Sequence, residues 1–383
     1  MAFRLLRMSL ILVGLCWLCA VPATAQQTKA PPPAQRVAVT VETIAKGLEH
    51  PWGMQFLADG RMLVTERPGR LRIVTKSGVI SPPIAGVPRV AAVGQGGLLD
   101  VVLDPQFADN NFIYLSYAEP RGIDTNGTSV ARARLVLDQA GGRLEDVKVI
   151  FQQTPAASGG LHFGSRLVFA PDGKLFITLG ERYQRDQAQN MASHFGKIIR
   201  INPDGSVPAG NPFVGTGTTK SEIWSFGHRN VQGAAINPAT GVLWINEHGP
   251  RGGDEINIPA RGKNYGWPVI GYGIDYSGAV IHEGSKKAGM EQPIYYWVPS
   301  IAPSGMAFYT GDAVPAWKGN VFIGALAGQH LARLVLDGER VIGEERLLAD
   351  LGERIRDVRM GPDGALWLLT DHPNGRVLRV IAK

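Results

Sequence analysis

The sequence contains only two cysteines, and their position determines which kinds of cysteine chemistry can be excluded. Both cysteines lie in the apolar segment Met8–Ala23. Basic residues precede this segment and small residues follow it up to Ala25, a pattern typical of a secretory signal peptide cleaved after Ala25. The mature chain would then have no disulfide, no thiolate nucleophile and no cysteine-ligated metal. Such an exported protein depends on a large hydrophobic core, which about 350 residues can supply.

A second hydrophobic run of transmembrane length is also lacking. The sequence therefore predicts a signal peptide over residues 1–25, a disordered proline-rich lead-in over 26–36 and a single domain over 37–383. The mature chain is expected to be periplasmic or secreted, without membrane insertion. An uncleaved anchor is the alternative for the N-terminal segment. A lipoprotein is disfavoured because leucine precedes both cysteines.

Clustered charge of one sign is missing as well. The formal net charge of +6 comes from basic residues scattered along the chain, with no block of lysine and arginine. Nucleic-acid-binding proteins usually gather their basic residues on one face. The pattern therefore predicts no nucleic-acid partner, and the charge relates to solubility.

Amphipathic helical segments are scarce, while 48 glycines and 26 prolines indicate frequent turns. What recurs is a turn containing Asp, Asn or Gly, followed by a short apolar run that often alternates with polar residues. Six copies occur along the chain: LADGRMLVTE, DPQFADNNFIYLSYAE, APDGKLFITLGE, NPATGVLWINEH, WKGNVFIGAL and GPDGALWLLTD.

Six such units predict an all-β fold, a six-bladed β-propeller of four-stranded antiparallel sheets. The early segment VAVTVETI (residues 37–44) is expected to pair with the last blade and close the ring. A two-sheet β-sandwich is the alternative architecture. In a propeller the loops of all blades meet at one rim, so functional residues should be scattered singly, close to strand ends.

Two candidate residues flank one predicted hairpin. His162 lies in SGGLHFGSR before the first strand, and Glu181 lies in LGER after the second. Both ends of a hairpin return to the same rim, so the carboxylate can hold one imidazole nitrogen and raise the basicity of the other. Taken alone, His162 also fits a packing role. Gln95, in the glycine-rich turn VGQGG, is either a polar turn residue or a ligand contact.

Arginines occur where an anionic partner is expected. In WSFGHRNVQG, Arg229 and Asn230 follow aromatic residues, and a desolvated guanidinium needs an anionic or carbonyl partner. Arg354 and Arg356 are two apart on a strand-like segment and therefore project to the same face. The two repel each other unless an anion lies between them, which favours a di- or tricarboxylate ligand. Solvated charges at a sheet edge are the alternative.

The segment NEHGPRGGDEINIPARGKNYGWP combines carboxylates with glycines, a proline and turn carbonyls. Hard oxygen ligands of this kind suit Ca²⁺. The spacing is not that of an EF-hand, and a loop held by salt bridges is the alternative. Tyr295–Trp297, in YYWVPSIAPSG, is either aromatic core or a stacking wall for a flat ligand.

In combination, the motifs GQGGLLDVVLDP, GHRNVQG, NEHGPRGGDEIN, GKNYGWP and RIRDVR resemble those of a known family. It comprises the soluble, periplasmic aldose sugar dehydrogenases that use pyrroloquinoline quinone, relatives of soluble quinoprotein glucose dehydrogenase. The resemblance covers nearly all of the mature chain, and the family fold is a six-bladed propeller. It implies pyrroloquinoline quinone and Ca²⁺ as cofactors, an aldose substrate and an external electron acceptor, in a monomer or homodimer.

Residue by residue, the resemblance implies a catalytic set. His162 is the general base that takes the anomeric hydroxyl proton while hydride moves to the quinone C5, Glu181 orients it, and Arg229 polarises the quinone oxygens. The implied cofactor-binding residues are Gln95, Arg229, Asn230, Trp297, Arg354 and Arg356. Calcium would be bound by the carbonyls of Gly249 and Pro250 or by a second set, Glu255 and Tyr265, and would polarise the C5 carbonyl.

One position departs from the family pattern. Relatives carry Lys or Arg in the segment matching GALAGQH, where this chain has Ala327. Losing a charge-assisted hydrogen bond there would weaken cofactor binding by about ten- to hundredfold. Gln329 or another residue must then compensate, or the protein holds its cofactor poorly.

The leading hypothesis is a quinoprotein that oxidises the anomeric hydroxyl of aldoses to lactones. A Ca²⁺-dependent propeller lactonase or other hydrolase is one alternative, but it has no use for two arginines converging on one ligand. A non-catalytic sugar- or protein-binding propeller is the other, favoured by Ala327 alone. Selectivity among sugars is expected in rim loops such as residues 273–292.

Overall fold

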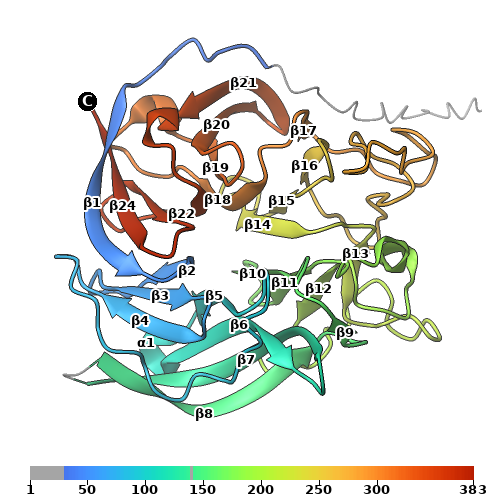
Figure 1. Cartoon of the computed structure of the whole chain (residues 1–383), viewed down its shortest axis with the longest axis horizontal. Helices are drawn as coiled ribbons and strands as arrows, with labels where there is room; N and C mark the ends of the chain where they lie inside the picture. Colours follow the sequence, from blue (N-terminus) through green and yellow to red (C-terminus); the bar gives the residue numbers. More distant parts are fainter. Residues whose placement is uncertain (1–29, 139–140) are drawn as a thin grey trace, which may run out of the picture.

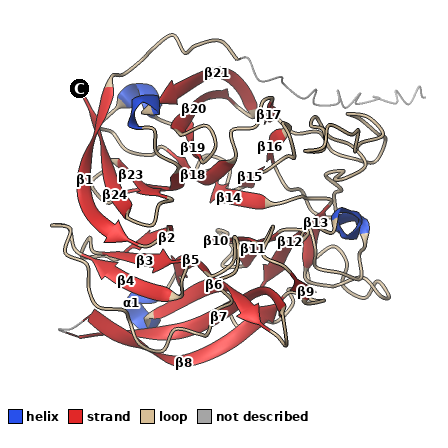
Figure 2. Cartoon of the chain, in the orientation of Figure 1, coloured by secondary structure: helices blue, strands red, loops and turns tan. Residues whose placement is uncertain are grey.

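Antiparallel sheets arranged in a ring make up the computed structural model, which describes residues 30–138 and 141–383 (Figure 1). Figure 2 shows that strands dominate and that helix is confined to short turns between them. The helical turns are α1 (Phe107–Asn110), η1 (Arg185–Gln189), η2 (Pro315–Trp317) and η3 (Ala349–Leu351).

Six sheets form the blades, each following the previous one in sequence. The first blade contains β2 (Pro51–Phe56), β3 (Met62–Glu66) and β4 (Arg70–Val74). The second contains β5 (Leu98–Leu103), β6 (Phe112–Pro120), β7 (Thr125–Asp138) and β8 (Gly141–Gln152), with β9 (Ala157–Ser158) beside β7. The third contains β10 (Gly164–Phe169), β11 (Leu175–Leu179), β12 (Lys197–Ile201) and β13 (Ile223–Phe226).

The other three blades close the ring. The fourth contains β14 (Val231–Ile236), β15 (Leu243–Glu247), β16 (Asp254–Asn257) and β17 (Tyr295–Trp297). The fifth contains β18 (Pro303–Phe308), β19 (Val321–Ala325), β20 (His330–Asp337) and β21 (Arg340–Leu347). The sixth contains β22 (Ile355–Met360), β23 (Leu366–Thr370) and β24 (Gly375–Ala382), and β1 (Val39–Leu48) completes it. The predicted six-bladed β-propeller is confirmed.

Ring closure takes the form expected from the sequence. β1 pairs antiparallel with β24, with Val41 opposite Val380, so the first strand completes the last blade. The first blade has three strands instead of four, because β2–β4 are followed only by a single bridge between Val74 and Ile80. The next residues read SPPIAGVP, and prolines lack the N–H that a fourth strand would need.

The hydrophobic core lies between neighbouring blades. Six clusters of buried side chains each join two adjacent sheets, as Leu63 of β3 and Val101 of β5 do between the first and second blades. A blade therefore buries its apolar faces only against its neighbours, which explains why the repeat is needed all the way round.

The innermost strands share a local irregularity. β2, β5, β10, β14, β18 and β22 contact one another around the centre of the ring, and each has a register shift near its start where it pairs with the next strand of its blade. β-Bulges bend a strand and redirect its side chains. The starts of the inner strands are therefore where the repeated fold turns polar side chains towards one rim.

The structure describes only part of the N-terminal region. The predicted signal peptide, residues 1–25, and the start of the lead-in, residues 26–29, lie outside the described residues. From residue 30 onward the lead-in runs beside β21, where the Pro31 carbonyl accepts from Glu344 N at 3.0 Å. Within residues 30–138 and 141–383, no helix has both the length and the apolar character required to cross a membrane.

Candidate active site

The predicted site residues gather at the rim where the inner strands begin. Gln95 precedes β5, His162 precedes β10, Arg229 precedes β14 and Arg354 precedes β22. Glu181 follows β11, the second strand of its blade, and so returns to the same rim. Residues far apart in the sequence therefore meet because the propeller repeats one topology.

The predicted histidine–carboxylate pair is present. His162 Nδ1 lies 2.6 Å from Glu181 Oε2, and both side chains are buried. The backbone allows this approach because residue 180 is glycine: a Cβ there would lie 2.1 Å from the His162 carbonyl oxygen. A second contact fixes the histidine backbone, since its N–H donates to Gln95 Oε1 at 2.9 Å.

The tautomer of His162 follows from its partner. A carboxylate only accepts, so Nδ1 carries the proton and Nε2 presents its lone pair. Nε2 has no hydrogen-bond partner among the described residues. The next residue, Phe163, lines one cavity, and the partner carboxylate Glu181 lines a second, so His162 lies between residues of two cavities.

A second pair in the next blade shows what distinguishes His162. His228 and Glu247 have the same 19-residue separation, with Nδ1 2.9 Å from Oε1. The Nε2 of His228, however, lies 2.9 Å from Ser225 Oγ, and the imidazole is fully buried and stacked on Tyr265. Both nitrogens of His228 are thus hydrogen-bonded, whereas Nε2 of His162 has no such partner among the described residues.

Burial holds the pKa of His162 below its ordinary value. Glu181 opposes this shift, while the nearby Arg229 and Arg182 guanidinium groups add to it. The imidazole is therefore neutral at neutral pH, which is the state a general base requires.

The fall of kcat/KM at low pH, its acid limb, is expected to follow the pKa of His162. Neutral His162 is lost when the pH falls through its lowered pKa, so kcat/KM should hold down to a pH below 6.5. Glu181→Gln removes the interaction that raises the pKa, so its acid limb should move lower still. Its kcat should fall by about ten- to hundredfold because the ring loses its orienting carboxylate. A pH series of kcat/KM for both proteins tests this; an acid limb that moves upward would contradict it.

The larger opening, here called the central cavity, has a volume of about 260 Å³ and lies over the inner strands. Its polar lining includes Gln95, Gln232, Arg67, Arg354, Arg356 and Asp371. Three guanidinium groups thus face one carboxylate. The cavity carries a net positive charge and is suited to an anionic ligand.

Arg354 and Arg356 reach the same side, as their spacing predicts. Their Nη2 atoms lie 3.3 and 3.1 Å from Asp371 Oδ2. Asp371 therefore supplies part of the negative charge that the sequence predicted between the two arginines. Burial lowers the pKa of Arg356 to about 10, although Asp371 opposes the shift. Burial also acts to raise the pKa of Asp371, but Arg356 and the His50 hydrogen bond outweigh it and hold the value below the ordinary range.

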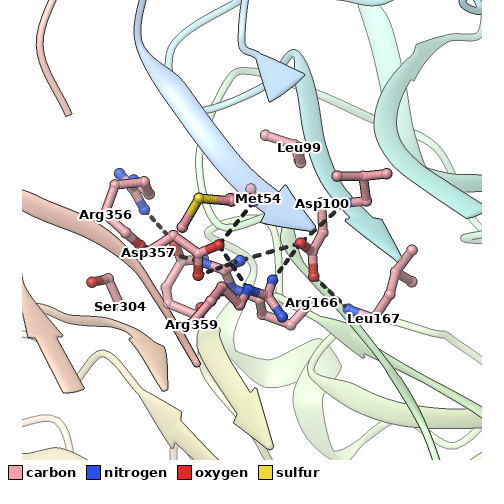
Figure 3. A network of polar contacts seen from close by, with 12 residues as sticks. Met54, Leu99, Asp100, Arg166, Leu167, Ser304, Arg356, Asp357 and Arg359 are labelled. Carbon is pink, nitrogen blue, oxygen red and sulfur yellow. Dashed lines mark hydrogen bonds and ion pairs between the residues drawn. The ribbon is translucent and has the colours of Figure 1, made fainter. Parts of the chain in front are cut away.

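A layer of ion pairs between β5, β10 and β22, here called the floor layer, adjoins this cavity through Trp52 and Arg356. Figure 3 shows its side chains. Arg166 lies 3.0 Å from Asp357 Oδ1 and 3.3 Å from Asp100 Oδ1. Arg359 bridges the same two carboxylates, each at 2.9 Å. Arg166 Nη2 also donates to the carbonyl of Arg356 at 3.1 Å, and its guanidinium packs 4.1 Å from the Trp52 ring that lines the cavity. The layer fills the centre of the ring and fixes the backbone of Arg356.

Arg229 lines a neighbouring opening, here called the side cavity, of about 170 Å³ together with Glu181, Tyr183 and Trp267. Its Nη1 donates to the carbonyls of His248 and Gly249 at 3.1 and 2.7 Å. The guanidinium also lies 5.2 Å from the Trp267 ring. Carbonyls and a ring thus neutralise this arginine only in part, and no carboxylate pairs with it among the described residues.

The four predicted calcium-binding residues surround one small cavity of about 20 Å³: Gly249, Pro250, Glu255 and Tyr265. Both predicted sets of calcium ligands therefore lie around the same cavity. Burial raises the pKa of Glu255 to about 8, and the neighbouring Glu247 and Asp254 add to the shift, so a cation would relieve this buried acid. No metal-binding group of three or more His, Cys, Asp or Glu side chains occurs in the described ranges, so a cation here depends on backbone carbonyls.

Not every predicted residue reaches these cavities. Trp297 is fully buried in the core between the fourth and fifth blades, and its indole N–H donates to Glu344 Oε1 at 3.2 Å. Asn230 is buried behind Gly164 and Gln232, whose N–H groups its Oδ1 accepts at 3.2 Å. The Tyr265 hydroxyl donates to the Ile258 carbonyl and accepts from Ala260 N at 2.8 Å, so its backbone carbonyl is the oxygen that remains for a cation.

Sequence reasoning missed several residues of the central cavity, among them Trp52, Arg67, Gln232 and Asp371. Asp371 had a usable signal, because it follows the second strand of its blade as Glu181 does. Arg67 also follows such a strand, yet the motif TERPGR reads as an ordinary charged turn. Only the ring brings both to the arginines of the sixth blade.

Unpaired donors test whether a quinone with carboxylates fits the central cavity. The Nε atoms of Arg67 and Arg356 are buried without a hydrogen-bond partner, and so is the Nδ2 of Asn230 behind the wall. Buried donors are rarely left unsatisfied, because each costs about 1–3 kcal/mol. A flat ligand with several carboxylates and carbonyl oxygens, such as pyrroloquinoline quinone, supplies the missing acceptors.

Comparison with known proteins gives consistent matches. A family model described as Glucose / Sorbosone dehydrogenase matches residues 48–379. The chain is 49% identical over 345 residues to the aldose sugar dehydrogenase YliI of Escherichia coli (strain K12), covering 89% of this chain and 92% of that protein. A crystal structure of a glucose dehydrogenase has 53% identity and a TM-score of 0.88, covering 90% of this chain and 100% of that one.

One solved relative carries its cofactor in its description. It is the PQQ-bound form of an aldose sugar dehydrogenase from Streptomyces coelicolor, with 30% identity and a TM-score of 0.76, covering 92% of this chain and 100% of that one. Fold and site together define a class: six-bladed propeller enzymes with a carboxylate-held histidine beside an arginine-lined cavity. The chain belongs to the glucose/sorbosone dehydrogenase family. The resemblance to this family of sugar dehydrogenases, drawn from the motifs of the sequence, is confirmed.

Proposed function

We propose that the protein oxidises the anomeric hydroxyl of aldose sugars to lactones, with pyrroloquinoline quinone as cofactor, and passes the electrons to an external acceptor. One observation carries the proposal: Glu181 holds His162 at Nδ1, and Nε2 of this buried histidine has no hydrogen-bond partner among the described residues. When bound, the quinone supplies the acceptor for the hydride that leaves the sugar. The protein supplies binding, orientation and the base.

His162 is the base of this proposal. Its neutral Nε2 accepts the proton of the anomeric hydroxyl, and the resulting imidazolium is stabilised by Glu181 2.6 Å away. The side cavity, lined by Glu181, Tyr183 and Arg229, receives the sugar. The residues around it can therefore exclude water from the reacting carbon while the hydroxyl faces the imidazole.

The arginines hold the cofactor in place. Arg354 and Arg356 would bind its carboxylates in the central cavity, with Gln95 at the other edge. Arg229, anchored through the carbonyls of His248 and Gly249, would bind the quinone oxygens, and Asn230 would act from behind the wall by holding Gly164 and Gln232. Trp297 would act from within the core, by shaping the wall and not by contact.

Reconstitution tests the function directly. Cofactor-free protein given Ca²⁺ and pyrroloquinoline quinone should reduce an electron-accepting dye when an aldose is added, across a panel of sugars. Lactone hydrolysis without quinone would instead favour a hydrolase. Absence of quinone binding at micromolar concentration in calorimetry would favour a non-catalytic propeller. Oligomeric state, as monomer or homodimer, follows from light scattering of the same sample.

Calcium forms a second part of the proposal, with Gly249, Pro250, Glu255 and Tyr265 as its binding residues around the small cavity. Chelation should abolish dye reduction, and Ca²⁺ should restore it better than Mg²⁺, which needs a tighter octahedral site. Glu255→Gln should raise the Ca²⁺ concentration needed by about tenfold, since one carboxylate ligand is lost. The control Glu283→Gln removes an exposed carboxylate paired with Lys287 and should change nothing. Equal Ca²⁺ requirements in both variants would contradict this assignment.

Export completes the proposal. The N-terminal pattern of the sequence supports a signal peptide cleaved after Ala25 and a periplasmic or secreted mature protein. N-terminal sequencing of the protein recovered from a periplasmic extract tests this, and a first residue other than Gln26 would revise the cleavage site.

A further inference from the structure

The central cavity contains an arginine that no motif singled out. Arg67 directly follows β3 in the first blade and lines the cavity together with the arginines of the neighbouring sixth blade. Its Nη1 donates to the Gly94 carbonyl at 2.9 Å, while its Nε is buried and has no partner among the described residues. Arg67 therefore donates one hydrogen bond to the cavity wall and keeps another donor, Nε, for a ligand.

Charge in the cavity is unbalanced at Arg67. Asp371 is the carboxylate of the lining, and its two oxygens are already shared by His50, Arg354 and Arg356. Arg67 forms no ion pair within residues 30–138 and 141–383. It is close enough to act electrostatically on Arg356, whose pKa it helps to lower. Arg67 also helps to lower the pKa of Asp371, but that carboxylate is already paired with Arg354 and Arg356. A guanidinium without an ion pair of its own, beside two others, is suited to an anion from outside the chain.

The position of Arg67 is fixed before any ligand binds. Its carbonyl accepts from Leu98 N at 3.0 Å, and a Cβ on residue 97 would lie 2.0 Å from that oxygen, so Gly97 is required for the contact. Arg67 is thereby held against the turn 94–97 that carries Gln95. Groups that are fixed in advance bind a ligand without paying the cost of ordering.

We infer that Arg67 is a third anchor, with Arg354 and Arg356, for the carboxylates of the anionic ligand in the central cavity. The inference rests on the proposed function for the identity of that ligand, a quinone with three carboxylates. It also answers the question that Ala327 raises. Residue 327 adjoins Leu326 at the edge of this cavity, and the positive charge missing there is supplied by Arg67 from the first blade.

Affinity, not turnover, tests the inference. We expect Arg67→Ala to raise the Kd for pyrroloquinoline quinone by about ten- to hundredfold in titration calorimetry, the range for losing a charged hydrogen bond. Arg67→Lys should fall between wild type and Arg67→Ala, because it keeps the charge and loses the fork of donors. Arg61→Ala is the matched control: Arg61 precedes the same strand at its other end and pairs only with the exposed Asp59. Its Kd should equal that of the wild type.

A second probe separates charge recognition from a merely structural role. The trimethyl ester of the quinone keeps the ring system and loses the carboxylate charges. The ratio of Kd values between Arg67→Ala and wild type should fall to about one for the ester, whereas a variant with a disturbed cavity would bind both probes worse. If Arg67→Ala does not fold, as judged by thermal unfolding, Arg67→Gln replaces it in the same comparison.

The outcomes are distinguishable. Equal Kd values for the acid in wild type and Arg67→Ala overturn the inference and leave the proposed function standing. Equal losses for the acid and its ester overturn it too, because the arginine would then act on the cavity wall alone. Failure of the wild type to bind the quinone overturns the proposed function together with the inference.

Discussion

Replacing His162 by glycine should lower kcat for aldose oxidation by about 10²–10⁴-fold, the usual contribution of a positioned general base. Glycine is the suitable replacement because His162 has φ 51°, a backbone conformation that glycine adopts without strain. The Kd for the quinone should stay within about threefold of wild type, since the imidazole lines neither cavity with its own atoms. Dye-linked kinetics and calorimetry on the reconstituted protein measure the two effects separately.

Chemical rescue sharpens this expectation. The variant leaves a hole the size of the ring it lost, so added imidazole should restore part of the activity, and the rescue should follow the concentration of its neutral form. Wild-type protein with the same imidazole serves as the control. A folded His162→Gly protein that retains more than about a tenth of wild-type kcat would mean that another group takes the proton.

The second large effect concerns stability. Asp357→Asn should lower the free energy of unfolding by about 3–5 kcal/mol, because it leaves Arg166 and Arg359 in the centre of the ring with Asp100 as their remaining carboxylate. All four side chains lie in the floor layer (Figure 3). Denaturant unfolding monitored by tryptophan fluorescence gives the difference.

Two comparisons decide whether the buried charge is the cause. Asp363→Asn lies in the same blade and removes a carboxylate that is one-third exposed and paired with Arg379, so it should cost under about 1 kcal/mol. Asp357→Asn combined with Arg359→Met removes one charge of each sign and should lose less than Asp357→Asn alone. Equal losses at Asp357 and Asp363, or a double variant less stable than Asp357→Asn, would contradict this explanation.

The floor layer also links stability to function. Arg166 holds the carbonyl of Arg356 and packs on Trp52, and both of these residues line the central cavity. A loss of balance in the layer would therefore loosen the cavity as well as the fold. This is why charged residues are kept at the centre of the ring, where apolar packing would serve stability as well.

The repeat explains how much of the site could be foreseen. Every inner strand begins at the same rim, so a motif placed before a strand, such as that of His162 or Arg229, could be assigned to the site from its position alone. Trp297 shows the limit of that reasoning, because its motif matches the family while its side chain packs in the core. The direction of one side chain depends on its neighbours across two blades, which a linear pattern does not contain.

By itself, the sequence determined the ring of blades, its closure by β1, the family and the histidine–carboxylate pair, because each depends on local turns, short apolar strands or one hairpin. Tertiary structure alone decided which histidine keeps a free nitrogen, since Ser225 occupies that of His228 and no described residue occupies that of His162. It also decided that Arg67 and Asp371 join the arginines of the last blade. Those contacts exist only when the ring closes, so residues some 300 positions apart share one electrostatic environment.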